Sequence, residues 1–136
     1  MDTHILSIPY KAMRYASYGD YQKLADDSVE ITVVALPDWR HEFLIALHEF
    51  IEEAVTRHRG IKEPDILAFD LAHLDSDDPG MIPSAPYHQE HVLATAVEML
   101  VARELGVDWT EYGKACEGIN ILDSGDTRLS PAFVTW

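Results

Sequence analysis

The hydrophobic positions of this chain follow two different periods, one before residue 38 and one after it. Before it, apolar and β-branched residues gather at 3–8 (THILSI) and 29–36 (VEITVVAL). Short runs of this kind, closed by a proline or bounded by polar residues, are typical of strands. Between them, residues 13–21 are rich in tyrosine, and Gly19-Asp20 predicts a turn. We therefore expect a small antiparallel sheet in residues 1–37.

From residue 38 onward the apolar positions recur at helical spacing. The pattern predicts four helices, at about residues 39–59, 63–73, 85–105 and 109–117. Asp38, Ser84 and Asp108 are suited to cap three of them, because short polar side chains accept hydrogen bonds from the free amides of a first turn. The third helix is apolar nearly all round, which predicts a central position. The fold class is thus α+β, with the sheet followed by a bundle of about four helices.

A length of 136 residues suits one domain, and a hydrophobic fraction of 47% excludes wholesale disorder. Within that single domain we distinguish the β-rich part (1–37), a helical part (38–118) and a C-terminal tail (119–136). The tail has no clear period, so the sequence does not assign it a role.

The charge balance narrows the classes of partner. Twenty-four acidic against ten basic residues give a net charge of −14, which argues against binding nucleic acid through a basic patch. Cation binding or docking on a basic partner fits it better. No apolar run reaches the roughly 18–20 residues that span a bilayer, and the N-terminus does not read as a signal peptide. A single cysteine, Cys116, fits a reducing compartment, so we expect a cytoplasmic protein that binds no membrane; its oligomeric state is not readable.

The first predicted helix carries the densest chemistry. His48 and Glu52 stand one turn apart and project from the same face, at the edge of the apolar side. The stretch H-E-x-x-E resembles the zinc motif H-E-x-x-H with a carboxylate in place of the second histidine. Glu49 is the counterpart of the catalytic base, although it projects roughly 80° away from the His48–Glu52 stripe. An ordinary amphipathic helix with solvated glutamates accounts for the same pattern.

The third predicted helix presents a second set of polar residues. His91 and Glu98 lie on one narrow stripe, with His88 to its side. A carboxylate in an apolar run is costly unless it is paired, so Glu98 needs a cation, a metal, a histidine or a hydrogen bond from a tyrosine. If the two helices pack antiparallel, their stripes can face each other, and Asp70 on the helix between them can close the set.

The predicted metal ligands are therefore His48, Glu52, His91, Asp70, His88 and Glu98. Mixed imidazole and carboxylate sites suit zinc first, with manganese or iron as alternatives. The aspartates at 75, 77 and 78 resemble part of a calcium loop, but the remaining ligand positions of an EF-hand are missing.

Several motifs together resemble a group of small proteins encoded by bacteriophages and prophages, over roughly residues 10–117. The segments that carry the resemblance are D-W-R, A-L-H-E-F-I-E-E-A, R-H-R-G-I, A-F-D, D-P-G, A-P-Y-H-Q-E-H and E-L-G-V-D-W. That family has no established activity, so the resemblance implies a setting, the cytoplasm of an infected bacterium. The residues it brings forward are His48, Glu49, Glu52, Asp70, Pro86, Tyr87, His88 and His91.

Three functions remain open at this point. The first is a metal-dependent hydrolase of a small-molecule or protein substrate, with Glu49 accepting a proton from a metal-bound water. The second is a non-catalytic acidic protein that inhibits or sequesters a basic host factor, as an anti-defence protein does. The third is a nucleotide pyrophosphatase of the all-helical kind, in which carboxylate pairs hold magnesium; the histidines fit it poorly, because magnesium prefers oxygen ligands.

Overall fold

The computed structural model describes residues 2–122, which form a three-stranded sheet and four α-helices. This confirms the α+β class, with the sheet first and the helices after it. The elements are β1 (Thr3–Ile8), β2 (Gly19–Lys23), β3 (Val29–Val34), α1 (Trp39–His58), α2 (Glu63–Ala72), α3 (His88–Glu104) and α4 (Trp109–Leu122), with two short 3-10 helices, η1 (Tyr10–Ala12) and η2 (Pro79–Met81).

The sheet has the order β1-β3-β2 and is mixed. The expected antiparallel pairing holds for β2 and β3, whereas β1 runs parallel to β3, with Ile5 opposite Ile31. β3 lies between the other two strands. The chain reverses direction after β1 and again after β2, so β3 runs parallel to β1 on one side and antiparallel to β2 on the other. Its alternate residues are buried, and the side chain of Ile31 is fully enclosed.

The strand β2 was not predicted. Gly19 and Asp20, interpreted above as a turn, are its first two residues. Polar residues at the start of a strand resemble a turn in the sequence, but here the Asp20 side chain is buried and accepts hydrogen bonds from Arg14, whose Nη2 lies 3.0 Å from Oδ1. The ion pair with Arg14 thus makes a buried carboxylate tolerable inside this strand.

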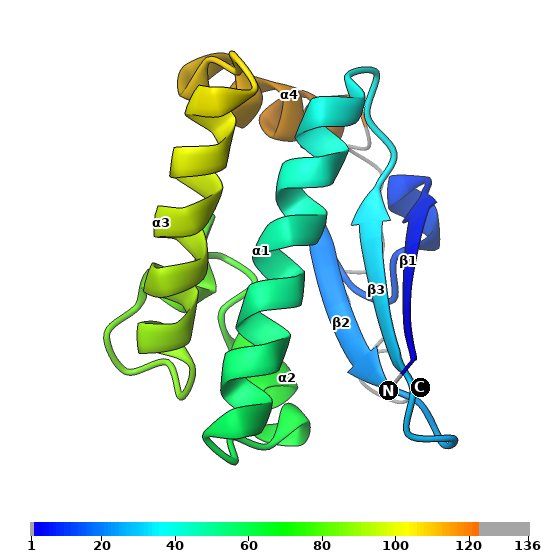
Figure 1. Ribbon diagram of the computed structural model, residues 1–136, viewed down its shortest axis with the longest axis vertical. Coiled ribbons are helices and arrows are strands. Elements are labelled where there is room, and N and C mark those ends of the chain that lie inside the picture. Colours follow the sequence, from blue (N-terminus) through cyan, green and yellow to red (C-terminus); the bar gives the residue numbers. More distant parts are fainter. Residues whose placement is uncertain (1, 123–136) are drawn as a thin grey trace.

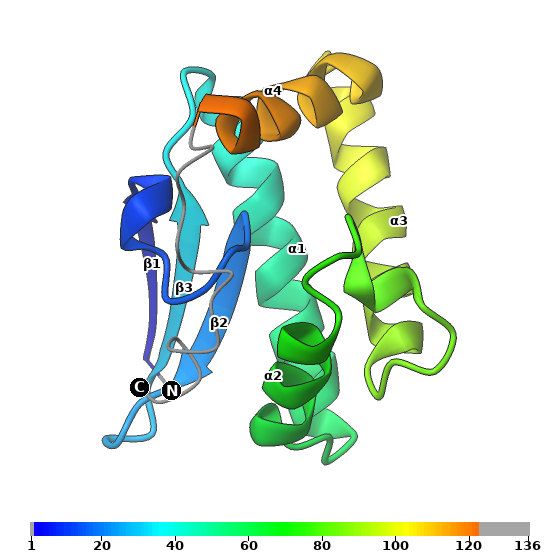
Figure 2. The ribbon, with the colours of Figure 1, turned by 180° about the vertical axis from the view of Figure 1, so that it is seen from behind.

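The helices form two further layers on one side of the sheet. α1 lies between the sheet and α3, and α3 runs antiparallel to α1 (Figure 1). α2 lies beside the C-terminal half of α1, and α4 crosses the opposite end of the molecule (Figure 2). The core centres on Leu44 and Ile45 of α1 and the inner face of β3. A helix placed between two layers presents one side to each, which is why both apolar and ionisable residues of α1 are buried.

Two of the predicted caps are present. Asp38 accepts a hydrogen bond from the Arg40 amide (2.9 Å) at the start of α1, and Asp108 accepts one from the Glu111 amide (2.9 Å) before α4. The third helix begins at His88, with Tyr87 in the cap position, rather than after Ser84. α4 continues through Gly118 to Leu122, so the first residues of the expected tail are helical, and 123–136 lie outside the described residues.

The prediction that the third helix is central was wrong. α3 forms the outer layer, and large apolar side chains on its far face are exposed, including Leu100 at 65%. The side that meets α1 is a stripe at four-residue spacing, made of Glu90, Ala94, Glu98 and Ala102. Small and ionisable side chains therefore form the contact between α1 and α3. No helix in residues 2–122 is both long and apolar enough to cross a membrane.

Candidate metal centre

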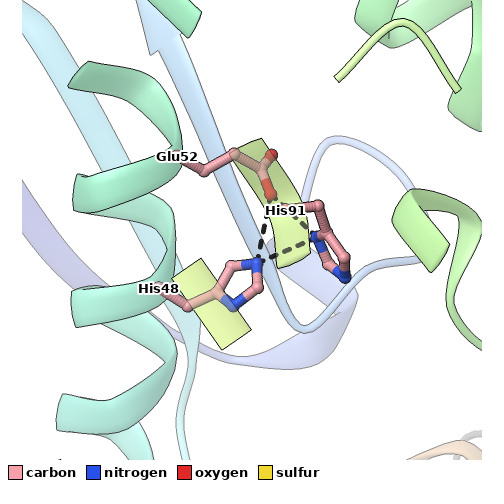
Figure 3. A group of neighbouring side chains, drawn as sticks. All are labelled: His48, Glu52 and His91. Atoms are coloured by element: carbon pink, nitrogen blue, oxygen red, sulfur yellow. Dashed lines mark hydrogen bonds and ion pairs between the residues drawn. The ribbon is translucent and has the colours of Figure 1, made fainter. Parts of the chain in front are cut away.

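Three side chains from α1 and α3 converge on one point between the helices (Figure 3). His48 Nε2 lies 3.1 Å from Glu52 Oε2, Glu52 Oε2 lies 2.8 Å from His91 Nδ1, and the two imidazole nitrogens are 3.0 Å apart. All three side chains are nearly enclosed. One turn of helix brings His48 and Glu52 together, and the antiparallel packing of α3 supplies His91. This group could hold a metal ion.

The size of this triangle matches a metal coordination sphere. Ligands at about 2.1 Å from a tetrahedral zinc stand about 3.4 Å from one another. The observed edges of 2.8–3.1 Å are a few tenths of an ångström shorter, so small side-chain rotations would open the triangle to that spacing. Three protein donors also leave a coordination position for a water or a substrate, as in catalytic rather than structural zinc sites.

The outer atoms of His48 and Glu52 are held as well. His48 Nδ1 lies 3.3 Å from Glu98 Oε1, and the Tyr112 hydroxyl donates to the other oxygen of Glu98 at 3.1 Å. The Tyr21 hydroxyl donates to Glu52 Oε1 at 3.2 Å. Carboxylates behind metal-bound histidines fix the ring orientation and the tautomer. Glu98 therefore stands behind a candidate ligand, and of the partners considered for it above it has both a histidine, His48, and a tyrosine, Tyr112.

The other histidine is positioned by η2 and the residue before it. His91 Nε2 lies 2.8 Å from Asp78 Oδ1, close enough for an ion pair, although the contact is not aligned as a hydrogen bond. The ring rests on Gly80, where an added Cβ would lie 2.3 Å from His91 Cγ. His88 Nδ1 lies 2.9 Å from the Gly80 carbonyl oxygen. His88, predicted as a ligand, thus contacts the segment that supports His91 and is not part of the three-residue group.

Without a metal, these groups form a network of buried ion pairs. Burial opposes a charge on the imidazoles, but Glu52 and Glu98 outweigh it and raise the pKa of His48 to about 11. Burial likewise opposes a charge on His91, yet Asp78 and Glu52 raise its pKa to about 9. Burial also disfavours the charged form of Glu52, but hydrogen bonds from both histidines lower the pKa of that carboxyl.

Asp70 lies apart from the three-residue group. Its Oδ2 accepts a hydrogen bond from the Tyr15 hydroxyl at 3.0 Å, and its Oδ1 accepts one from Tyr87. Burial raises the pKa of Asp70 to about 6, against the effect of these two hydrogen bonds. Of the six predicted ligands, the structure brings His48, Glu52 and His91 together, places Glu98 behind His48, and leaves Asp70 and His88 outside.

Glu49, the predicted base, faces β2 and lines the same cavity as the three-residue group. Its carboxylate packs on the backbone of Gly19, where an added Cβ would lie 2.7 Å from Oε1. Burial raises the pKa of Glu49 well above its ordinary value, and the nearby charge of Glu52 adds to this. No hydrogen bond or ion pair to the Glu49 carboxylate is found within residues 2–122.

The cavity has a volume of about 630 Å³ and extends from the histidines to η1, β2 and α2. Sequence reasoning missed Asp78 and Tyr112, and it left open whether Tyr21 lines a pocket or lies at the edge of the sheet. Asp78 was interpreted as part of a turn or a calcium loop. No periodicity marks these positions, because they act from loops and from a neighbouring strand and helix.

No protein-family model, curated protein or solved structure matches this chain. The function must therefore be argued from the geometry of the site.

Proposed function

We propose that the protein is a metal-dependent hydrolase with one zinc ion held by His48, Glu52 and His91. The observation that carries the proposal is the convergence of three donor atoms within 2.8–3.1 Å, two from one turn of α1 and one from α3. Two histidines and one glutamate are a donor set used by catalytic zinc. Non-haem iron uses the same set, so metal identity is part of the test.

The chemistry follows from the remaining ligand position and from Glu49. A zinc ion bound there would lower the pKa of a water ligand toward neutrality and polarise a substrate carbonyl. Glu49 supplies a carboxylate in the same cavity whose oxygens are not occupied by hydrogen bonds within residues 2–122. The positive charge of a bound metal would oppose the effect of burial on Glu49 and favour its carboxylate form. We assign to that carboxylate the acceptance of a proton from the attacking water and its return to the leaving group. The reaction class is hydrolysis of an amide or ester.

The first experiment is elemental analysis of the purified and dialysed protein. We expect about one zinc per chain, lost in His48→Ala and in His91→Ala. His58→Ala is the matched control, because His58 is exposed at the end of α1, away from the cavity. Loss of metal in the control as well, or retention in both site variants, would contradict this centre. If the protein holds about one iron per chain instead of zinc, the three ligands stay as proposed, but the function changes from a hydrolase to an oxygen-activating enzyme.

The second experiment separates binding of metal from catalysis. Glu49→Gln keeps the shape of the side chain but removes the base. We expect this variant to retain zinc and to lose at least a hundredfold in kcat for hydrolysis of an activated ester or anilide, since a positioned base contributes about 10²–10⁴-fold. Unchanged kcat would remove Glu49 from the mechanism.

A non-catalytic binding protein, which sequesters a basic factor of a phage-infected bacterium, is the second candidate. The observation that favours it is an exposed apolar groove between β1 and α1, which shares no lining residue with the cavity. Its large exposed side chains are Ile5, Trp39, Phe43 and Phe50. Absence of metal in the wild-type protein, together with tight binding of a basic host protein that Phe43→Asp abolishes, would favour this function over hydrolysis.

A further inference from the structure

The wall of the cavity beside the metal group is strongly acidic. Eight acidic side chains line it, and seven carboxylates remain when the buried Glu49 is neutral, whereas Arg14 is the one arginine or lysine among its described lining residues. Arg14 does not offset this charge for a ligand, because it is already paired with Asp20 and lies 3.6 Å from Glu63. Replacing two imidazolium charges by one divalent metal leaves the sum unchanged. The cavity is therefore negative with or without the metal, and its low-dielectric walls strengthen the field inside.

The same wall is aromatic. The protein has six tyrosines, and all of them line this cavity: Tyr10, Tyr15, Tyr18, Tyr21, Tyr87 and Tyr112. The hydroxyls of four are bound to carboxylates: Tyr15 and Tyr87 to Asp70, Tyr21 to Glu52, and Tyr112 to Glu98. These bonds fix the rings, so the wall is rigid. Carboxylates combined with tyrosine rings are the groups that recognise ammonium ions in proteins.

We propose that the cavity takes an organic cation, and that the substrate is an amide or ester carrying an ammonium group a few bonds from the scissile carbonyl. This inference rests on the proposed function and names its substrate class. Two observations carry it independently, the charge of the wall and the gathering of every tyrosine in the chain. The same charge disfavours phosphate esters and nucleotides as substrates, since an anion would be repelled by the acidic side chains of the wall.

One carboxylate at the rim is suited to a direct test. Asp77 lines the cavity and is exposed, and no hydrogen bond or ion pair of its side chain is found in residues 2–122. Asp75 lies two residues away in the same loop, is also exposed and does not line the cavity. Removing either charge changes the net charge of the protein by the same amount. A difference between the two variants therefore reports the cavity rather than the field of the whole protein.

The experiment is calorimetric titration with three probes of similar size. They are N-(2-trimethylammonioethyl)acetamide, its neutral isostere N-(3,3-dimethylbutyl)acetamide, and the anion 3-acetamidopropanoate. The quaternary ammonium cannot coordinate the metal, so its binding reports the wall. We expect the cation to bind at least tenfold more tightly than the neutral isostere, and the anion to show no measurable binding. Equal affinity for the cation and its isostere, or preference for the anion, would overturn the inference.

Two variants test whether the cationic probe binds in this cavity. Asp77→Asn should weaken binding of the cationic probe about threefold and leave the neutral probe unaffected, whereas Asp75→Asn should change neither. Equal losses in both variants would overturn the assignment of the cation to this cavity.

Titrating both the zinc-loaded and the chelator-treated protein separates the two proposals. Preference for the cation in wild-type protein that takes up no zinc when zinc is offered would contradict the hydrolase and support the cation site. One bound zinc per chain with no preference for the cation would support the metal centre and contradict the cation site.

Discussion

Gly80 supports the imidazole of His91, and there is no space between them for a side chain. An added Cβ at Gly80 would lie 2.3 Å from Cγ and 2.5 Å from Nδ1 of the ring. Nδ1 is the nitrogen that faces His48 and Glu52. The glycine in the D-P-G segment is therefore required by the position of the His91 ring, since any larger residue would displace Nδ1 from the three-residue group.

Gly80→Ala should consequently lower metal affinity by at least tenfold, because the ring must move by more than the tolerance of a metal bond. The comparison is Gly113→Ala on α4, where an added Cβ meets nothing within 4 Å. That control should keep full metal affinity. Competition with a chromogenic chelator measures both. Equal metal affinities of the two variants would mean that the His91 ring and the segment around Gly80 shift together, and that the glycine is not needed for metal binding.

Glu98→Gln should weaken the metal without emptying the site. Glu98 holds the outer nitrogen of His48 at 3.3 Å and receives the Tyr112 hydroxyl. Loss of a carboxylate behind a metal-bound histidine typically costs about 10–100-fold in affinity. Glu104→Gln, at the exposed end of α3, is the matched control. A Glu98→Gln variant with wild-type affinity would show that His48 is oriented without this contact.

Metal removal should lower stability. A ligand that binds only the folded state, at a free concentration 100-fold above its Kd, adds about 2.7 kcal/mol to the free energy of unfolding. We expect urea unfolding with and without a chelator to differ by about this amount in the wild-type protein. The His48→Ala variant should unfold at the same urea concentration in both conditions. A chelator effect of equal size in that variant would place the stabilising ion elsewhere.

Asp70 should make the metal-free protein less stable as pH rises from about 4 to 7. Its pKa is raised from 3.8 to about 6 in the folded state. A carboxyl with a raised pKa imposes no cost while both states are protonated, and the cost grows as pH rises above 3.8 and is complete above the folded value. Two units correspond to about 3 kcal/mol. Asp70→Asn should therefore gain about that much relative to the wild type across this range.

Urea unfolding between pH 4 and pH 7 in the presence of a chelator checks this prediction. The control is Asp65→Asn, on the exposed side of α2, whose stability should run parallel to that of the wild type. Parallel curves for Asp70→Asn as well would show that the two tyrosine hydroxyls fully compensate the charge.

The outcome for β2 and α3 shows where sequence reasoning failed. Gly19-Asp20 has the composition of a turn, and the paired Arg14 that makes Asp20 tolerable in a strand is visible only in three dimensions. The apolar far face of α3 predicted a central helix, yet its Leu100 is 65% exposed. Hydrophobicity alone does not show which face of a helix meets the protein when the buried face carries glutamates and alanines.

The sequence by itself determined the class of fold, the extent of α1 with its Asp38 cap, and the pair His48 and Glu52, because helical periodicity fixes which residues share a face. It also indicated His91 and Glu98 as polar exceptions in an apolar helix. Only the tertiary structure decided that His91 joins the pair, that Glu98 stands behind it, and that Asp78 and Gly80 position the ring. The reason is physical: these contacts join segments far apart in sequence, and their distances depend on how α3 and η2 pack against α1.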